Sequence, residues 1–277
     1  MIPVLLALGA SLAWGFGDFC GGVKARALPA LSVLAAAQPV GLALLVAAVA
    51  IRGHGPPGPE ILWACLAAVF GTSGLVAFYR GMAAGAISLV APIAGTAAVV
   101  PVVWALARGE HPSGLQELGF VLVLGGVVAT SWERTPGRAR VTAGAGWAAL
   151  ALVAFGGYYV PMHAASRHDF LWASLVFRST STTLVWLTVL ALGRRLRGIR
   201  PHLPVLTAIG VFDTGGNVLF AAASQEHGLL SVVSVLASLY PVVTVLLART
   251  ALRERVQRTQ EAGVVVTLAG VALISAG

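Results

Sequence analysis

Ionisable side chains interrupt several long apolar runs of this sequence. The clearest are Asp18, Arg178 and Asp213. A charge at the centre of a lipid bilayer costs about 2.5 to 3.5 kcal/mol on insertion scales, so such residues tend to face a protein interior or a water-filled cavity. These three residues are therefore the first candidates for binding a solute or carrying a proton.

Asp18 shares a helical face with Trp14 and Ser11, because the spacings are i, i+4 and i, i+7. Its carboxylate could carry a coupling proton or pair with a cationic substrate. The alternative is an interfacial carboxylate that is partnered by Lys24 or Arg26. The sequence leaves both interpretations open.

Asp213 and Asn217 stand four residues apart, and Phe220 continues the same helical face. Asp213 is the second candidate for proton coupling. The alternative is that Asp213 lies near the end of a span, where it forms a hydrogen bond with Thr214 or with a neighbouring helix.

Arg178 precedes the polar run STSTT, residues 179–183. Its guanidinium could hold a carboxylate-bearing substrate through two parallel hydrogen bonds. It could equally be the structural partner of Asp213 or Asp18.

His163 lies on the same helical face as Tyr159, four residues earlier. It could titrate during transport, or it could make a single satisfying hydrogen bond. Tyr158 and Tyr159 could combine with Trp14 into an aromatic wall suited to aromatic or cationic solutes, unless these rings only pack.

The composition indicates the kind of element that carries these residues. The chain of 277 residues is 58% hydrophobic and only 10% charged, whereas soluble domains carry roughly a quarter charged residues. Ten apolar runs approach the length of about 20 residues that a helix needs to cross a bilayer. They cover residues 3–22, 31–51, 60–79, 85–107, 115–132, 143–164, 170–192, 204–223, 228–248 and 260–276. We expect an all-α polytopic membrane protein.

The second half of the chain repeats the first. Residues 228–270 match 85–126 closely, and a constant offset of 144 pairs Glu110 with Glu254, Gly119 with Gly263 and Gly126 with Gly270. With five spans per half, an odd number, the second copy enters the bilayer from the opposite side. We therefore predict two inverted five-helix repeats, 1–132 and 143–277, joined by a linker at 133–142. Inverted repeats are typical of secondary transporters, whose substrate site lies between the halves.

The repeat carries a recognisable pattern. The pattern consists of Ser231, Pro241, Glu254, Gln260, Gly263 and Gly270, with Trp14–Gly15 in the first run and Arg178 in the seventh. It resembles the EamA repeat of the drug/metabolite transporter superfamily. The resemblance implies ten helices around a central cavity and transport of small metabolites across the inner membrane. The chain departs from the pattern at Ala98, where the repeat usually has Pro, and at Gln38, which replaces the first-half Arg.

The links are charged unequally. Those after spans 2, 4, 6 and 8 carry only Arg52, Arg108 and Arg167, while thirteen basic residues lie in the other links. The positive-inside rule places both termini outside the cytoplasm, whereas the resemblance implies cytoplasmic termini. Because the basic residues lie in short links, the net charge of +8 does not indicate a nucleic-acid partner. Glu110, also in a link, is expected to be solvated.

We therefore predict a secondary transporter for an amino-acid-like or organic amine solute, with possible proton coupling. The alternatives are a lipid-modifying membrane enzyme and a passive channel, but the links are too short for a catalytic cluster. We expect no catalytic activity, cofactor or metal; the expected partners are a small-molecule substrate and the lipid bilayer, and a homodimer is compatible with the sequence. The candidate substrate-binding residues are Trp14, Asp18, Gln38, Tyr159, His163, Arg178, Asp213 and Asn217.

Overall fold

The computed structural model describes residues 1–84, 90, 94–131, 138–196, 198–226, 229–252 and 258–277. Within these residues the chain forms helices joined by short links, and no β-strand is present. The α-helices are α1 (Ile2–Ala25), α2 (Ala30–Arg52), α3 (Trp63–Ala84), α5 (Val99–Ala107), α6 (Gly114–Ser131), α7 (Arg138–Ser166), α8 (Phe170–Ala191), α9 (Leu203–Gln225), α10 (Leu230–Ala237), α11 (Tyr240–Leu252) and α12 (Arg258–Ala276). Short 3-10 helices cover Pro59–Leu62, Thr96–Ala98 and Arg200–His202.

Most of these helices suit a lipid environment. Among the described residues, six helices are long and apolar enough to cross a membrane, and four shorter apolar helices accompany them. The shorter ones are Thr96–Ala107, Gly114–Ala129, Leu230–Thr244 and Val265–Ile274. Many large apolar side chains are exposed on the helix surfaces, for example Leu190 and Val121, each with 68% of its surface accessible. The chain is therefore an all-helical, multi-pass membrane protein.

Several helix boundaries differ from the sequence prediction, and two of them stand out. The apolar run 228–248 is interrupted at Ser238 and Leu239, so that α10 ends before α11 begins. Pro241 explains the break, because proline has no backbone N–H to continue the hydrogen-bond ladder. Helix α7 begins at Arg138, inside the predicted linker 133–142.

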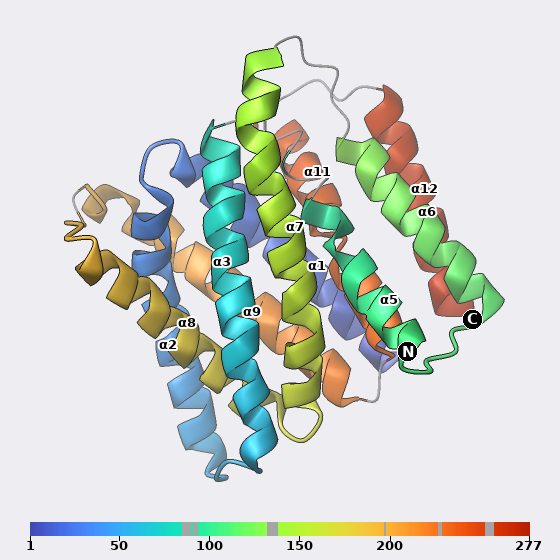
Figure 1. The fold of residues 1–277 in the computed structure, drawn as a ribbon, viewed down its shortest axis with the longest axis horizontal. Coiled ribbons are helices and arrows are strands. Elements are labelled where there is room, and N and C mark those ends of the chain that lie inside the picture. The colour runs from blue at the N-terminus through green and yellow to red at the C-terminus, as the bar shows by residue number, and fades with distance from the viewer. Residues whose placement is uncertain (85–89, 91–93, 132–137, 197, 227–228, 253–257) are drawn as a thin grey trace.

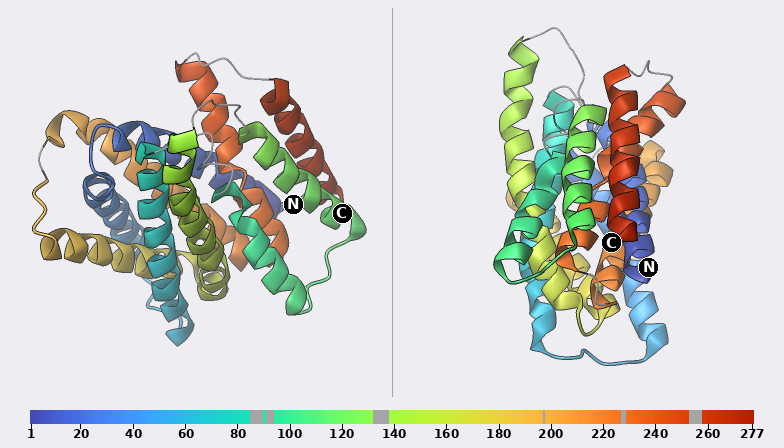
Figure 2. Two further views of the ribbon diagram at one scale, coloured as in Figure 1. Left: turned by 45° about the horizontal axis from the view of Figure 1, so that its top comes forward. Right: turned by 90° about the vertical axis from the view of Figure 1, so that its right-hand side faces the viewer.

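The helices pack in pairs that join the two parts of the chain. Helix α1 packs against α9, α3 against α7, α2 against α8 and α6 against α12. Figures 1 and 2 show α6 and α12 side by side, and the C-terminus lies beside the link that joins α5 to α6, where Gly277 comes close to Ser113. Every one of these pairs joins an element of the first repeat to an element of the second.

Glycines at equivalent repeat positions let α6 and α12 approach closely. A Cβ atom added at Gly126 would lie 2.8 Å from the carbonyl oxygen of Gly263, and one at Gly119 would lie 2.8 Å from that of Gly270. Real Cβ atoms do not come so close to backbone atoms, so only glycine fits at these crossings. Small residues at helix interfaces are a common basis of helix association in membranes.

Substitution Gly126→Val is expected to destabilise the protein by about 1 to 3 kcal/mol, because the added methyl groups force α6 away from α12. The neighbouring Gly125→Val is a matched control, since a Cβ atom at Gly125 meets nothing within 4 Å. Unfolding in mixed micelles measures both. Equal loss of stability in the two variants would refute the close crossing.

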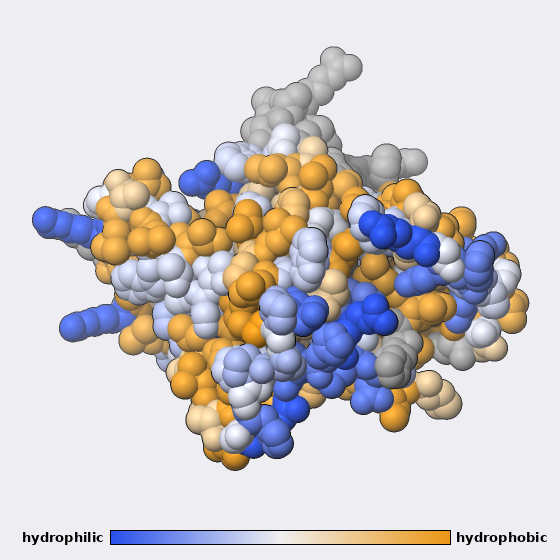
Figure 3. All heavy atoms as spheres, turned by 60° about the horizontal axis from the view of Figure 1, so that its bottom comes forward, coloured by the Kyte–Doolittle hydropathy of each residue, from blue (hydrophilic) through white to orange (hydrophobic). Residues whose placement is uncertain are grey.

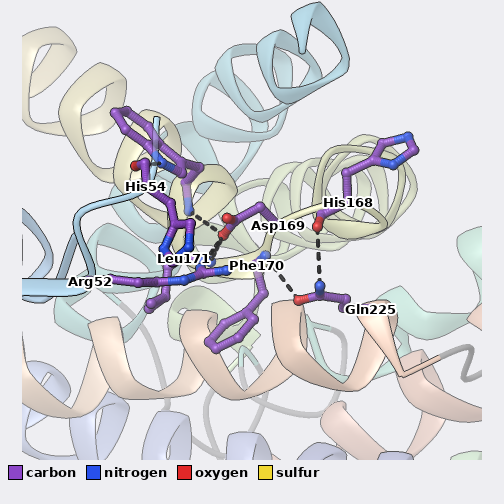
Figure 4. A network of polar contacts seen from close by, with 8 residues as sticks. Arg52, His54, His168, Asp169, Phe170, Leu171 and Gln225 are labelled. Carbon is purple, nitrogen blue, oxygen red and sulfur yellow. Dashed lines mark hydrogen bonds and ion pairs between the residues drawn. The ribbon is translucent and has the colours of Figure 1, made fainter. Parts of the chain in front are cut away.

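A polar network ties α2, α8 and α9 together at one end of the molecule (Figure 4). One carboxylate oxygen of Asp169 accepts from Arg52 at 2.8 Å and from the backbone N–H groups of Leu171 and Trp172 at 3.0 and 3.1 Å, which caps α8. Gln225 accepts from the N–H of Phe170 and donates to the carbonyl oxygen of His168. Figure 3 shows hydrophilic side chains gathered at this end, with hydrophobic side chains on the flanks.

Glu110 contradicts the expectation of a solvated link residue. Its carboxylate accepts from the backbone N–H groups of Leu230 and Ser231 at 2.8 and 3.1 Å, and from the Ser231 hydroxyl at 2.7 Å. A carboxylate at this position stabilises the first turn of α10 because the helix dipole is positive there. The sequence repeat pairs Glu110 with Glu254, which lies outside the described residues.

Candidate functional site

A cavity lies in the middle of the helix bundle, between elements of both repeats. Helices α1, α3, α7, α8 and α9 line it, and Tyr240 contributes the start of α11. Of the candidate residues predicted from the sequence, those in its wall are Trp14, Asp18, Tyr159, Asp213 and Asn217. Its volume of about 50 Å³ has room for only a few water molecules. Because ligand pockets occupy about 300 to 1,000 Å³, a metabolite would need the helices to separate.

Arg178 and Asp213 form an ion pair at the edge of this cavity. The Nη2 atom of Arg178 donates to Oδ2 of Asp213 at 2.7 Å, and the Arg178 side chain is 1% exposed. Nε of the same guanidinium has no hydrogen-bond partner. The pairing with Asp213 that the sequence left open is therefore present, and it neutralises both charges.

Asn217 is held by two hydrogen bonds. The Tyr158 hydroxyl donates to its Oδ1 at 2.7 Å, and its Nδ2 donates to the carbonyl oxygen of Asp213 at 2.7 Å. Both partners are buried or nearly so, and hydrogen bonds are stronger in such surroundings than in water. Asn217 thus fixes Tyr158 in the cavity wall.

Asp18 is the one carboxylate in the cavity wall that lacks an ion pair. It is 8% exposed, and in the described part of the chain no hydrogen bond or salt bridge reaches its side chain. The pairing with Lys24 or Arg26 is wrong, since Nζ of Lys24 lies 3.5 Å from Nδ1 of His202 instead. The hydroxyl of Tyr240, in the same wall, also lacks a partner. The cavity wall therefore contains one carboxyl group without a charged partner and one hydroxyl group without a hydrogen-bond partner.

Aromatic rings make up much of the same cavity wall. Trp14 contacts Tyr158, Tyr159 and Phe220 with ring centroids 6.0 to 6.3 Å apart. Phe155 meets Tyr240 edge to face at 6.3 Å. Aromatic faces attract cations, most strongly where water is excluded. The wall thus combines a carboxyl group with several aromatic rings.

Two predicted residues lie elsewhere. Gln38 is 2% exposed, and its Oε1 has no partner, but it does not line the central cavity. The adjacent Ala37 packs against Gly210 of α9, so Gln38 belongs to the region where α2 crosses α9. His163 lies one helical turn beyond Tyr159 and outside the cavity wall, and its Nδ1 has no partner.

Tyr158 also lines the wall, together with Trp14 and Tyr159, as the aromatic interpretation of the sequence expected. The residues of the wall that the sequence did not single out are Gly71, Leu75, Phe155, Phe177 and Tyr240. Phe155 lies three residues before Tyr158 on the same helical face, and Tyr240 immediately precedes the helix-breaking Pro241. These two positions could therefore have been selected from the sequence. Leu75 and Phe177 have no feature that separates them from other apolar residues of a membrane span.

Comparisons with known proteins agree on the kind of molecule. The model of the EamA-like transporter family matches residues 1–132 and 142–276. No curated protein matches in sequence. A solved crystal structure, described only as that of a protein, matches with a TM-score of 0.77 and 18% identity over 98% of this chain and 95% of that chain, which shows a shared fold. Since the family model covers nearly the whole sequence, the chain belongs to the EamA-like transporter family, within the drug/metabolite transporter superfamily.

Proposed function

We propose that the protein is a secondary transporter that moves a small organic amine or amino acid across the cytoplasmic membrane. The observation that carries this proposal is the central cavity, which has the uncompensated carboxylate of Asp18 in its wall. Residues from both repeats contribute to this wall, so movement of one repeat against the other would open it to either side. Sites between two repeats are typical of secondary transporters.

The packing of the helices supports ten spans in two inverted halves. The sequence repeat aligns α1 with α7 and α3 with α9. Exchanging the repeats therefore turns the α1–α9 pair into the α7–α3 pair, and both pairs are extensive contacts. The α2–α8 and α6–α12 pairs map onto themselves in the same exchange. A two-fold relation of this kind is what inverted repeats require.

The charges of the wall favour a cationic group in the substrate. Arg178 and Asp213 neutralise each other, which leaves Asp18 as the charge available to a ligand. An ammonium group beside Asp18 would also lie close to the aromatic rings of Trp14 and Tyr159 in the same wall, and cation–π contacts gain strength when water is excluded. An amino acid would fit if its carboxylate reached the unpaired Nε of Arg178.

Proton coupling follows from the same arrangement. A proton and a cationic substrate compete for the carboxylate of Asp18, because either one neutralises it. Protonation of Asp213 would release Arg178 from its ion pair and change the charge of the wall. Asp18 and Asp213 are therefore the proposed coupling residues, and substrate would leave as a proton binds.

A thermal-shift screen tests the substrate class. A ligand that binds only the folded protein stabilises it by about 2.7 kcal/mol at a hundred times its dissociation constant. We expect quaternary amines or amino acids to raise the apparent melting temperature, while neutral sugars and nucleosides leave it unchanged. Stabilisation by sugars alone would contradict a cation-binding cavity.

A further inference from the structure

A second cavity, of about 430 Å³, lies at the end of the molecule opposite the Arg52–Asp169 network. The start of α2, residues 29–32, forms one side of it, and Arg80 of α3, Trp147 of α7 and Arg194 form others. It shares no lining residue with the central cavity. Its volume falls within the range of ligand pockets, about 300 to 1,000 Å³.

Two guanidinium groups line this cavity without a carboxylate partner. Arg80 lies over the ring of Trp147 at 5.1 Å, which holds its side chain at the wall. Arg194 follows the end of α8, where Gly193 adopts a positive φ of 59°. The backbone N–H of Arg194 donates to the carbonyl oxygen of Val189 at 3.0 Å, which fixes the backbone of Arg194 against the helix end. Neither residue takes part in the salt bridges found among the described residues. Their charges are therefore available to an anion.

The first turn of α2 faces the same space. Pro29 occupies the N-cap position and has no side-chain oxygen that could accept from the first N–H groups. The N-terminus of a helix carries a partial positive charge and free N–H donors, which suit an anion. Residues 30 and 31, whose N–H groups belong to this turn, line the cavity.

Ser32 gives an independent indication of a ligand. Its side chain lines the cavity and only 7% of the residue is exposed, so bulk water reaches little of it. Within the described part of the chain its hydroxyl makes no hydrogen bond. The hydroxyl oxygen is not among the fully enclosed side-chain atoms that lack a partner, so a group bound in the cavity could form a hydrogen bond with it.

We propose that this cavity binds a phosphate group. Two guanidinium groups, a hydroxyl and a helix N-terminus together offer planar and convergent donors, which match the oxygen atoms of phosphate. The phosphate can belong to a phospholipid headgroup, because the cavity lies at the end of the bundle where the basic links gather, or to a soluble anion. The site stands apart from the proposed transport cavity.

Thermal-shift titration of the purified protein in detergent separates these sources. The probes are dihexanoylphosphatidylglycerol, dihexanoylglycerol, which lacks the phosphate, and inorganic phosphate, all at constant ionic strength. We expect the phosphate-bearing lipid to raise the melting temperature and dihexanoylglycerol to leave it unchanged. Stabilisation by inorganic phosphate would support a soluble source. No stabilisation by either phosphate compound, or equal stabilisation by dihexanoylglycerol, would overturn the proposal.

Single substitutions test the residues of the cavity. Arg80→Gln and Arg194→Gln each remove a charge-assisted hydrogen bond to the phosphate. Each substitution is therefore expected to weaken phosphate binding by about tenfold or more. Ser32→Ala should weaken it severalfold. Arg195→Gln is the matched control, since Arg195 neighbours Arg194 but does not line the cavity. Equal weakening in Arg195→Gln would show a diffuse charge effect and refute the site, as would unchanged binding in Arg194→Gln.

Discussion

Replacement of Asp213 by Leu is expected to destabilise the protein by about 3 to 5 kcal/mol. The change leaves the guanidinium of Arg178 buried without its carboxylate, and breaking one partner of a buried ion pair costs this much. Arg178 is 1% exposed, so water cannot replace the lost partner. The measurement is equilibrium unfolding in mixed micelles, compared with the unsubstituted protein.

The double variant Arg178→Met with Asp213→Leu should recover most of that loss, because it removes both charges at once. Arg52→Met is the control, since Arg52 is 35% exposed and Asp169 still accepts from two backbone N–H groups when Arg52 is replaced. We expect this variant to lose much less stability than Asp213→Leu. A double variant as unstable as the single one would show that the cost comes from lost packing and not from an unpaired charge.

Replacement of Asp18 by Asn is expected to weaken binding of an organic amine by about tenfold or more without loss of stability. A charge-assisted hydrogen bond contributes about 1.5 to 3 kcal/mol, which corresponds to at least a tenfold change in affinity. The buried carboxylate lacks an ion pair, so removing its charge relieves a desolvation cost. Thermal-shift titration with the tightest amine of the screen measures the affinity and the melting temperature together.

Glu117→Gln is the control for this variant, because Glu117 is exposed in the first turn of α6, far from the cavity wall. It should bind the amine as the unsubstituted protein does. Asp18→Asn should keep its stability and lose amine affinity, whereas Asp213→Leu should lose stability. This difference separates a carboxylate that binds ligand from one that stabilises the fold. Unchanged amine affinity in Asp18→Asn would remove Asp18 from the site.

Much of this arrangement could be predicted from the sequence, because the cost of a charge in lipid limits where a charge can lie. This cost favoured an interior position for Asp18 and Asp213, and the structure places both at one cavity. The glycines repeated at an offset of 144 established the repeat, and the structure adds that Gly119 and Gly126 lie where α6 crosses α12. Apolar runs of bilayer length became helices for the reason that backbone groups in lipid must pair within the segment.

Other features depend on neighbours that no sequence pattern identifies. The helical period places His163 on the face of Tyr159, but the cavity ends before the next turn. Gln38 occupies the position equivalent to Arg178, yet its helix turns it toward a crossing with α9. Glu110 caps α10 across 120 residues of sequence. Contacts between distant segments decide each of these positions.

Counterflow in proteoliposomes tests the central claim, that a cavity shared by two repeats opens to each side in turn. Vesicles are loaded with an excess of the unlabelled amine and diluted into a trace of the labelled one. Alternating access predicts transient accumulation of label above the outside concentration, which Asp18→Asn should abolish. Simple equilibration without an overshoot, or an overshoot unchanged in Asp18→Asn, would contradict this account.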